Sequence, residues 1–309
     1  MITIIIPSYN SQGTIRGCLD SVLNQSYGDR YEVILVDSSS DNTPQIVTME
    51  YPQVKLIHLE RKTDPGAARN IGIQEARGDV IAFIDSDCQA GSDWLEKIAA
   101  AHESSYRIVG GAVLNDNPEG DLVGWAGYLA EFREFILGHP KREVGHIPTC
   151  NISYKRAIFA VHGLFEGEYY PQEDLVYNYR LSRNGEKILL DPGIQIRHCH
   201  RSDFLDFLRH QRKIGLTTAR VLKMLPLPGS FIARHPFPGL LLVPVLPVMK
   251  FIKTVIVFVR YQPKVILKRP AVLFLFALGL AEWAIGFIQG MHGEFKTIPL
   301  QHTHTRKYR

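Results

Sequence analysis

Two aspartates separated by one residue follow an apolar run and form the strongest candidate site in the sequence. Asp85 and Asp87 come directly after Val80–Ile84. Two carboxylates placed so close together repel each other unless a cation holds them. Mg²⁺ and Mn²⁺ bind carboxylate oxygens together with the phosphates of a substrate. The pair therefore predicts a divalent-cation site for a phosphorylated substrate, with a solvated acidic turn as the alternative.

Further carboxylates and two histidines could take part in the same chemistry. Glu173 and Asp174 open a predicted helix, where an acid can act as a general base or simply stabilise the helix start by about 0.3–1 kcal/mol. Asp37 ends a second apolar run. His198 and His200 follow a later run, and a neutral imidazole is a suitable metal ligand. The sequence does not decide between the two histidines.

Alternating strands and helices must position these side chains. The predicted strands are Ile2–Ile6, Glu32–Asp37, Val54–Leu59 and Asp79–Asp85. The helices predicted between and after them are Ser11–Asn24, Thr43–Glu50, Gly66–Arg77 and Ser92–His102, the last with Ser92 as its N-cap. Such alternation is typical of an α/β fold with a parallel sheet, in which ligands bind at the carboxyl ends of the strands. Asp37, Asp85 and Asp87 lie at those ends.

The alternation ends near residue 105. Strands are predicted at Ile108–Val113, Lys187–Leu190 and Ile194–His198, and residues 115–148 are expected to be irregular. A basic amphipathic helix is predicted over 203–225.

The charge of the 309-residue chain divides into two parts. The formal net charge of +4 combines −9 over residues 1–200 with +13 over residues 201–309. We expect two regions, a catalytic domain at 1–225 and a membrane-associated helical region with a basic tail at 226–309. The four cysteines are scattered, without CxxC spacing or a dense framework, which favours reduced thiols over disulfides.

Two apolar stretches follow the basic helix. Residues 237–259 contain Lys250 and Lys253, and residues 271–291 contain Glu282. Neither is an uncharged run of about 20 residues, the length that a bilayer helix needs. We therefore expect a hairpin that enters an anionic membrane from its cytosolic face, with two full spans or a buried helical pair as alternatives. The catalytic domain would then lie on the cytosolic side. His302 and His304 in the tail are expected to be solvated.

Four motifs in order give the chain a resemblance to a known family. They are IIIPSYN, EVILVDSSSDNT, GAARNIGIQEARGDVIAFIDSD and QEDLVYNYRLSRNG. Together they resemble family 2 glycosyltransferases, over about residues 1–215. The resemblance implies the GT-A fold, with a mixed, mainly parallel central sheet, and a nucleotide-sugar donor.

The resemblance also implies roles for individual residues. The residues that match the nucleotide-binding segments are Pro7, Tyr9, Asn10, Asp37, Arg69, Asn70 and Asp85. Within that set, Tyr9 would pack on the base or ribose, and Asp37 would receive the base edge or the ribose. Ser38 stands where the family usually has a second acid, so the sequence departs from the family's pattern at the position that bears on the identity of the base.

The remaining implied roles concern the metal and the reaction. Asp85 and Asp87 match the metal-binding motif, with Asp87 bound to the ion more directly, and His198 would complete the site. Asp174, with Glu173 before it, matches the catalytic base of an inverting transfer. The cation would be Mg²⁺ or Mn²⁺, and the default donor is a UDP-sugar.

The predicted function is transfer of a sugar to a lipid-linked or membrane-proximal glycan acceptor, without processive synthesis, since the QxxRW motif of the processive members is missing. An inactive membrane-bound scaffold with this fold is one alternative. A nucleotidyltransferase is the other, although PSYNSQGT lacks the glycine-rich basic loop that it would need. No nucleic-acid recognition motif supports reading the basic helix as a nucleic-acid site.

Overall fold

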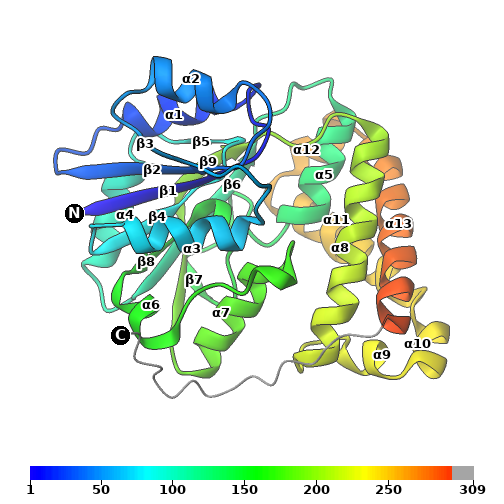
Figure 1. Ribbon diagram of the computed structural model, residues 1–309. Coiled ribbons are helices and arrows are strands. Elements are labelled where there is room, and N and C mark those ends of the chain that lie inside the picture. Colours follow the sequence, from blue (N-terminus) through cyan, green and yellow to red (C-terminus); the bar gives the residue numbers. More distant parts are fainter. Residues whose placement is uncertain (294–309) are drawn as a thin grey trace.

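The computed structural model describes residues 1–293 and is built around a nine-stranded sheet with the order β3-β2-β1-β4-β8-β6-β9-β5, in which β7 pairs with β9 (Figure 1). The strands are β1 Ile2–Ser8, β2 Tyr31–Asp37, β3 Lys55–His58, β4 Val80–Phe83, β5 Cys88–Ala90, β6 Ile108–Asn115, β7 Arg142–Val144, β8 Ile152–Lys155 and β9 Ile188–His198. The α-helices up to the basic segment are α1 Ile15–Leu23, α2 Thr43–Glu50, α3 Pro65–Glu75, α4 Trp94–His102, α5 Leu122–Phe132, α6 Ala157–His162 and α7 Glu173–Arg183. The tail histidines His302 and His304 lie outside the described residues.

The first four strands pair in parallel, as their apolar sequences predict. Every residue of β1 is buried, because helices cover both faces of this part of the sheet. Helix α3 lies directly on β1, and Gly72 permits that approach, since a Cβ there would lie 2.5 Å from Ile5 Cγ2. The carboxyl ends of β1, β2 and β4 therefore meet at one edge.

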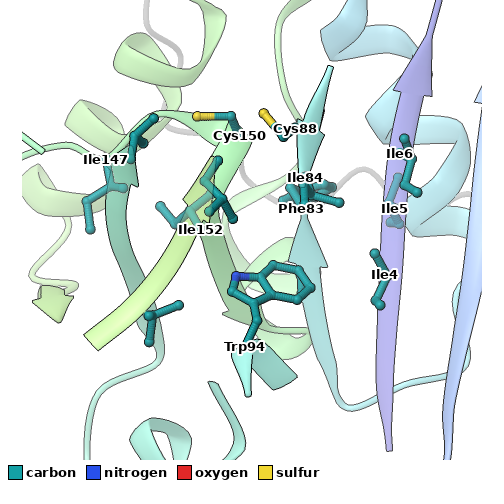
Figure 2. Close-up of a cluster of buried hydrophobic side chains, with 14 of the residues drawn as sticks. Ile4, Ile5, Ile6, Phe83, Ile84, Cys88, Trp94, Ile147, Cys150 and Ile152 are labelled. Carbon is teal, nitrogen blue, oxygen red and sulfur yellow. The ribbon is translucent and has the colours of Figure 1, made fainter. Parts of the chain in front are cut away.

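The second half of the sheet is mixed, since β8 runs antiparallel to both β4 and β6 while β6 and β9 are parallel. The two strands predicted over 187–198 are one strand, β9, whose register against β6 shifts between Gly111 and Ala112. The segment expected to be irregular contains α5 and β7, and α4 begins at Trp94 after Asp93 rather than after Ser92. Figure 2 shows part of the core that joins the two halves, with Phe83, Ile84, Trp94 and Ile152 among its buried side chains; Phe83 of β4 pairs with Ile152 of β8.

The basic helix is α8, Phe204–Met224, and it is covered along its length by the last described helix, α13, Val272–His292 (Figure 1). Glycines allow the two backbones to touch: a Cβ at Gly215 would lie 1.9 Å from the Trp283 carbonyl oxygen, and one at Gly286 would lie 1.9 Å from that of Arg212. Arg212 also forms an ion pair with Glu282, the acid inside the second apolar stretch.

Four shorter helices connect α8 to α13: α9 Ser230–Arg234, α10 Pro236–Leu242, α11 Val245–Tyr261 and α12 Pro263–Lys268. Among residues 1–293, α13 has the length and hydropathy of a bilayer-crossing helix. Helices α10 and α11 have that length and hydropathy only when they are taken together as one segment, which is bent by 44°. The most apolar part of α13 is 39% buried inside the protein, largely against α8.

Candidate active site

An open cavity of about 620 Å³ lies where the carboxyl ends of β1 and β4 meet α5, α7 and α8. Eight of the predicted site residues line it: Pro7, Tyr9, Arg69, Asp85, Asp87, Glu173, Asp174 and His198. Asn10, Asp37 and Asn70 are not among the lining residues, nor is His200. Residues more than 160 positions apart in the sequence are thus gathered in one place by the sheet and by α7.

Arg69 connects the two acidic segments at the floor of the cavity. Its Nη2 lies 2.7 Å from Asp85 Oδ1 and its Nη1 lies 2.8 Å from Glu173 Oε1, and the residue is 2% exposed. Buried ion pairs of this kind depend on all their members, because losing one leaves an uncompensated charge. Since both terminal nitrogens bind carboxylates, Arg69 is engaged in positioning Asp85 and Glu173.

Glu173 is the buried member of the α7 pair. Burial raises the pKa of its carboxyl group, and the neighbouring charge of Asp174 raises it further, against the lowering effect of Arg69. Its Oε2 has no hydrogen-bond partner among the described residues.

Asp174 is the accessible member of the pair, and it is held in place by backbone donors. Its Oδ1 accepts a hydrogen bond from Leu175 N at 2.7 Å, and its Oδ2 accepts one from Thr149 N at 3.1 Å. The position in the first turn of α7 explains the first contact, because helix starts leave backbone N–H groups free for an acidic side chain. Asp174 therefore presents an oriented carboxylate to the cavity, and Thr149, which the sequence analysis did not single out, helps to fix it.

Asp87, in the turn after β4, lies opposite His198, the last residue of β9. Asp87 Oδ1 and His198 Nε2 lie 3.6 Å apart, which is beyond a hydrogen bond but suits two donor atoms sharing one cation. Together with Cys88 they form a group whose possible ligand atoms all lie within 4.8 Å of one another. A hard cation prefers the carboxylate and the imidazole to the buried thiol, so Asp87 and His198 fit Mg²⁺ or Mn²⁺.

His200 lies outside this group, packed between aromatic rings. Its ring centroid is 5.4 Å from that of Phe132 and 5.9 Å from that of Tyr128. Burial lowers the pKa of His200 well below the ordinary value of a histidine, and the charge of His198 lowers it further. Of the two histidines that the sequence left open, His198 is the one placed beside Asp87.

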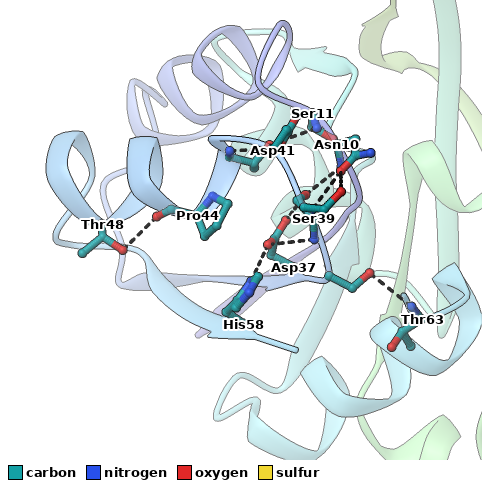
Figure 3. Close-up of polar contacts among 12 residues, drawn as sticks. Asn10, Ser11, Asp37, Ser39, Asp41, Pro44, Thr48, His58 and Thr63 are labelled. Carbon is teal, nitrogen blue, oxygen red and sulfur yellow. Dashed lines mark hydrogen bonds and ion pairs between the residues drawn. The ribbon is translucent and has the colours of Figure 1, made fainter. Parts of the chain in front are cut away.

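Asp37 and Asn10 join the loops that follow β1 and β2 (Figure 3). Asp37 is fully buried, and its carboxylate lies 2.7 Å from His58 Nδ1 and accepts a hydrogen bond from Ser39 Oγ at 2.5 Å. Asn10, with a φ of 52°, donates its backbone N–H to Ser39 Oγ at 2.7 Å. These contacts shape the wall beside Tyr9, which is 40% exposed.

Asn70 of α3 binds the backbone of Phe165 instead of lining the cavity. Its side-chain amide donates to the Phe165 carbonyl oxygen at 2.8 Å and accepts from Phe165 N at 3.0 Å. This pair of bonds fixes the segment that leads into α7 and its two acids.

Five side chains from the C-terminal helices also line the cavity: His210, Gln211, Ile214 and Thr218 of α8, and Lys250 of α11. His210 and Gln211 both contact Glu131 of α5, at 3.5 Å and 3.0 Å. The sequence analysis assigned none of these side chains to the site, because the segments that carry them lie outside every motif.

Comparison with known proteins connects the cavity to a family. The sequence model described as "Glycosyl transferase family 2" matches residues 3–163. Succinoglycan biosynthesis protein ExoO of Rhizobium meliloti is 42% identical over 252 residues, which cover 77% of this chain and 70% of ExoO. Glycosyltransferase AglE of Haloferax volcanii is 34% identical over 221 residues, which cover 69% of this chain and 71% of AglE.

Solved structures agree on the fold. Residues 1–349 of S. aureus TarS superimpose with a TM-score of 0.53 at 18% sequence identity, covering 97% of this chain and 94% of that chain. A structure of the same TarS fragment in complex with UDP-GlcNAc gives a TM-score of 0.53 as well. At this identity the likeness establishes the GT-A type of fold.

Proposed function

This chain belongs to glycosyl transferase family 2, and we propose that it transfers a sugar with inversion from a nucleotide sugar, assisted by a divalent cation, to an acceptor at a membrane surface. One observation carries the proposal: a single cavity holds the oriented carboxylate of Asp174 and the facing donor atoms of Asp87 and His198. A base and a cation site in one cavity are what a direct displacement requires. AglE is named as a glycosyltransferase and ExoO as a succinoglycan biosynthesis protein, which agrees with this chemistry.

In the proposed reaction, an acceptor hydroxyl oxygen attacks the anomeric carbon of the donor sugar. Asp174 takes the hydroxyl proton while the bond from the anomeric carbon to the diphosphate oxygen breaks. A cation held by Asp87 and His198 would neutralise charge on the departing nucleoside diphosphate. Tyr9, at the end of β1, would contact the base or ribose. Arg69 keeps Asp85 and Glu173 in place and takes no part in proton transfer.

The test of the donor and cation assignment is thermal unfolding of the full chain with UDP. At about 100 times its Kd, a ligand adds about 2.7 kcal/mol of stability, so UDP with Mn²⁺ should raise Tm by roughly 5–10 °C. EDTA and Asp87→Asn should each remove most of the rise, whereas the exposed control Asp29→Asn should retain it. An equal rise with EDTA would exclude the cation, and no rise with UDP, GDP or CDP would favour the inactive scaffold.

The membrane assignment is supported by the surface of α11. Six apolar residues fall within an arc of about 100° on the helix. They are 49–62% exposed: Val245, Val248, Met249, Ile252, Ile256 and Val259, which we call the outward stripe. Soluble proteins rarely expose a continuous apolar patch of this kind, and such a face suits an interfacial helix.

The packing of α13 favours attachment to the membrane surface over two full spans. Its partner along its length, α8, carries Arg209, Arg212 and Lys213, all exposed. If α13 crossed a bilayer in this arrangement, these charges would enter it too, at about 2.5–3.5 kcal/mol each near the centre. At the surface the same cations would instead meet anionic head groups.

The membrane assignment predicts that the outward stripe controls vesicle binding. The double variant Val248→Asp/Ile252→Asp should reduce co-flotation with anionic vesicles at least about tenfold, because two exposed apolar side chains lose their transfer to lipid. Val161→Asp, at an exposed position on α6, is the matched control and should float like the native protein. Unchanged flotation of the double variant would exclude α11 as the membrane-binding element.

A further inference from the structure

Lys250 brings an ammonium group into the cavity from the side of α11 that is opposite to the outward stripe. On a helical projection, Lys250, Thr254 and Phe258 lie about 130–170° from the centre of the stripe. Thr254 and Phe258 are fully buried, and Lys250 lines the cavity. The helix is therefore inverted relative to a surface helix of a soluble protein, with its apolar side outward and a cation inward.

The charges around Lys250 do not balance. Arg133, the residue directly after α5, also lines the cavity, and its Nη1 contacts Thr254 Oγ1 at 3.5 Å. Glu134 is shared between Arg133 Nε at 3.2 Å and Lys253 Nζ at 2.7 Å. Glu134 is thus taken up by two other cations, and Glu131 is already bound by His210 and Gln211 of α8.

Within residues 1–293, Lys250 has no carboxylate within ion-pair distance. Its Nζ lies 3.9 Å from the ring centroid of Trp283 on α13. Desolvation, together with a smaller effect of the charge of Arg133, lowers the pKa of Lys250 to about 7. Lys250 is half-buried. A cation that is partly removed from water without a counter-ion costs free energy, and an anion bound beside it would offset that cost.

We propose that Lys250 and Arg133 form a subsite for a phosphate group of the acceptor. This inference rests on the proposed function, because it assigns the far end of the same cavity to the second substrate. The shared chemistry is a phosphate ester, which accepts charge-assisted hydrogen bonds from an ammonium and a guanidinium group. A membrane-anchored source is favoured by the outward stripe, because α11 would place lipid on one side of the helix and the phosphate on the other.

The test measures binding of decyl phosphate, inorganic phosphate and decyl maltoside to the full chain by calorimetry, below the micelle concentrations. Lys250→Met should weaken binding of decyl phosphate by about tenfold or more, the usual effect of losing a charged hydrogen-bond donor. Lys264→Met, an exposed lysine on α12, is the matched control and should bind as the native protein does. Binding should also change the emission of Trp283, and Trp283→Phe should abolish that change.

The comparison of ligands identifies the source of the phosphate group, and the variants separate failure of the subsite from failure of the proposed function. Tighter binding of decyl phosphate than of inorganic phosphate supports a lipid-linked acceptor, and equal binding of the two supports a soluble phosphate ester. Decyl phosphate binding that is unchanged in Lys250→Met overturns the subsite, as does a UDP affinity that falls tenfold in that variant, since Lys250 would then serve the donor. UDP with Mn²⁺ tests the proposed function separately. If UDP fails to bind the native protein while phosphate binding still requires Lys250, the proposed function is wrong and the subsite stands.

Discussion

Replacing Asp174 with Asn is expected to lower the rate of sugar transfer by about 10²–10⁴-fold, the range attributed to a positioned general base. Asn is nearly the same size and its oxygen can accept the bond from Thr149 N, but it cannot take a proton at neutral pH. The rise in Tm produced by UDP with Mn²⁺ should therefore be unchanged. The variant should therefore lose activity in the chemical step and not in binding of the donor nucleotide.

The measurement is release of nucleoside diphosphate from a panel of UDP-sugars with Mn²⁺, with water as the acceptor. Asp206→Asn, an exposed acid on α8 paired with Arg209, is the matched control and should keep the native rate. A rate within threefold of the native value in Asp174→Asn would assign the base elsewhere. Glu173→Gln would then be the next variant, since Glu173 is the other carboxylate of α7 at the cavity.

Arg69→Met is expected to cause the largest loss of stability, about 3–5 kcal/mol, or on the order of 10 °C in Tm. The variant leaves Glu173 and Asp85 without the cation that both bind. Arg77→Met, on an exposed arginine just beyond α3, is the matched control and should change stability by less than about 0.5 kcal/mol. Denaturant unfolding of the two variants measures the difference.

The loss in Arg69→Met should also depend on pH. Glu173 already has a pKa above its ordinary value, so its ionisation disfavours the folded state as pH rises through that pKa. Without Arg69 the carboxyl group will hold its proton more strongly still. The destabilisation should therefore be smaller at pH 5 than at pH 8, and the opposite trend would mean that Arg69 does not stabilise these carboxylates.

Local patterns were sufficient for the first half of the fold. Thr43–Glu50 is a helix with the predicted ends, and the buried strand before Asp85 lies where its apolar run predicts it. These elements are set by spacing and burial within about ten residues, which a single sequence displays. The break predicted between the strands of 187–198 was wrong, because Pro192 and Gly193 signal a turn locally while pairing with β6 continues through a register shift.

The candidate site could be predicted only in part. Motifs located Asp87 and Asp174, but the double ion pair of Arg69 depends on the approach of α7 to α3, which no local pattern encodes. Lys250 was noted in the sequence as a charge that interrupts an apolar stretch. The signal that could have placed it inside is helical spacing, since it falls opposite six apolar residues of the same helix.

The two-sided helix α11 has a geometric consequence for substrate choice. A helix with its side chains is about 10–12 Å across. If lipid contacts the outward stripe while Lys250 faces the cavity, the height of the cavity above the bilayer is set by one helix diameter. Such an enzyme would select acceptors by the distance of the reactive hydroxyl group from the membrane surface, as well as by the sugar that carries that group.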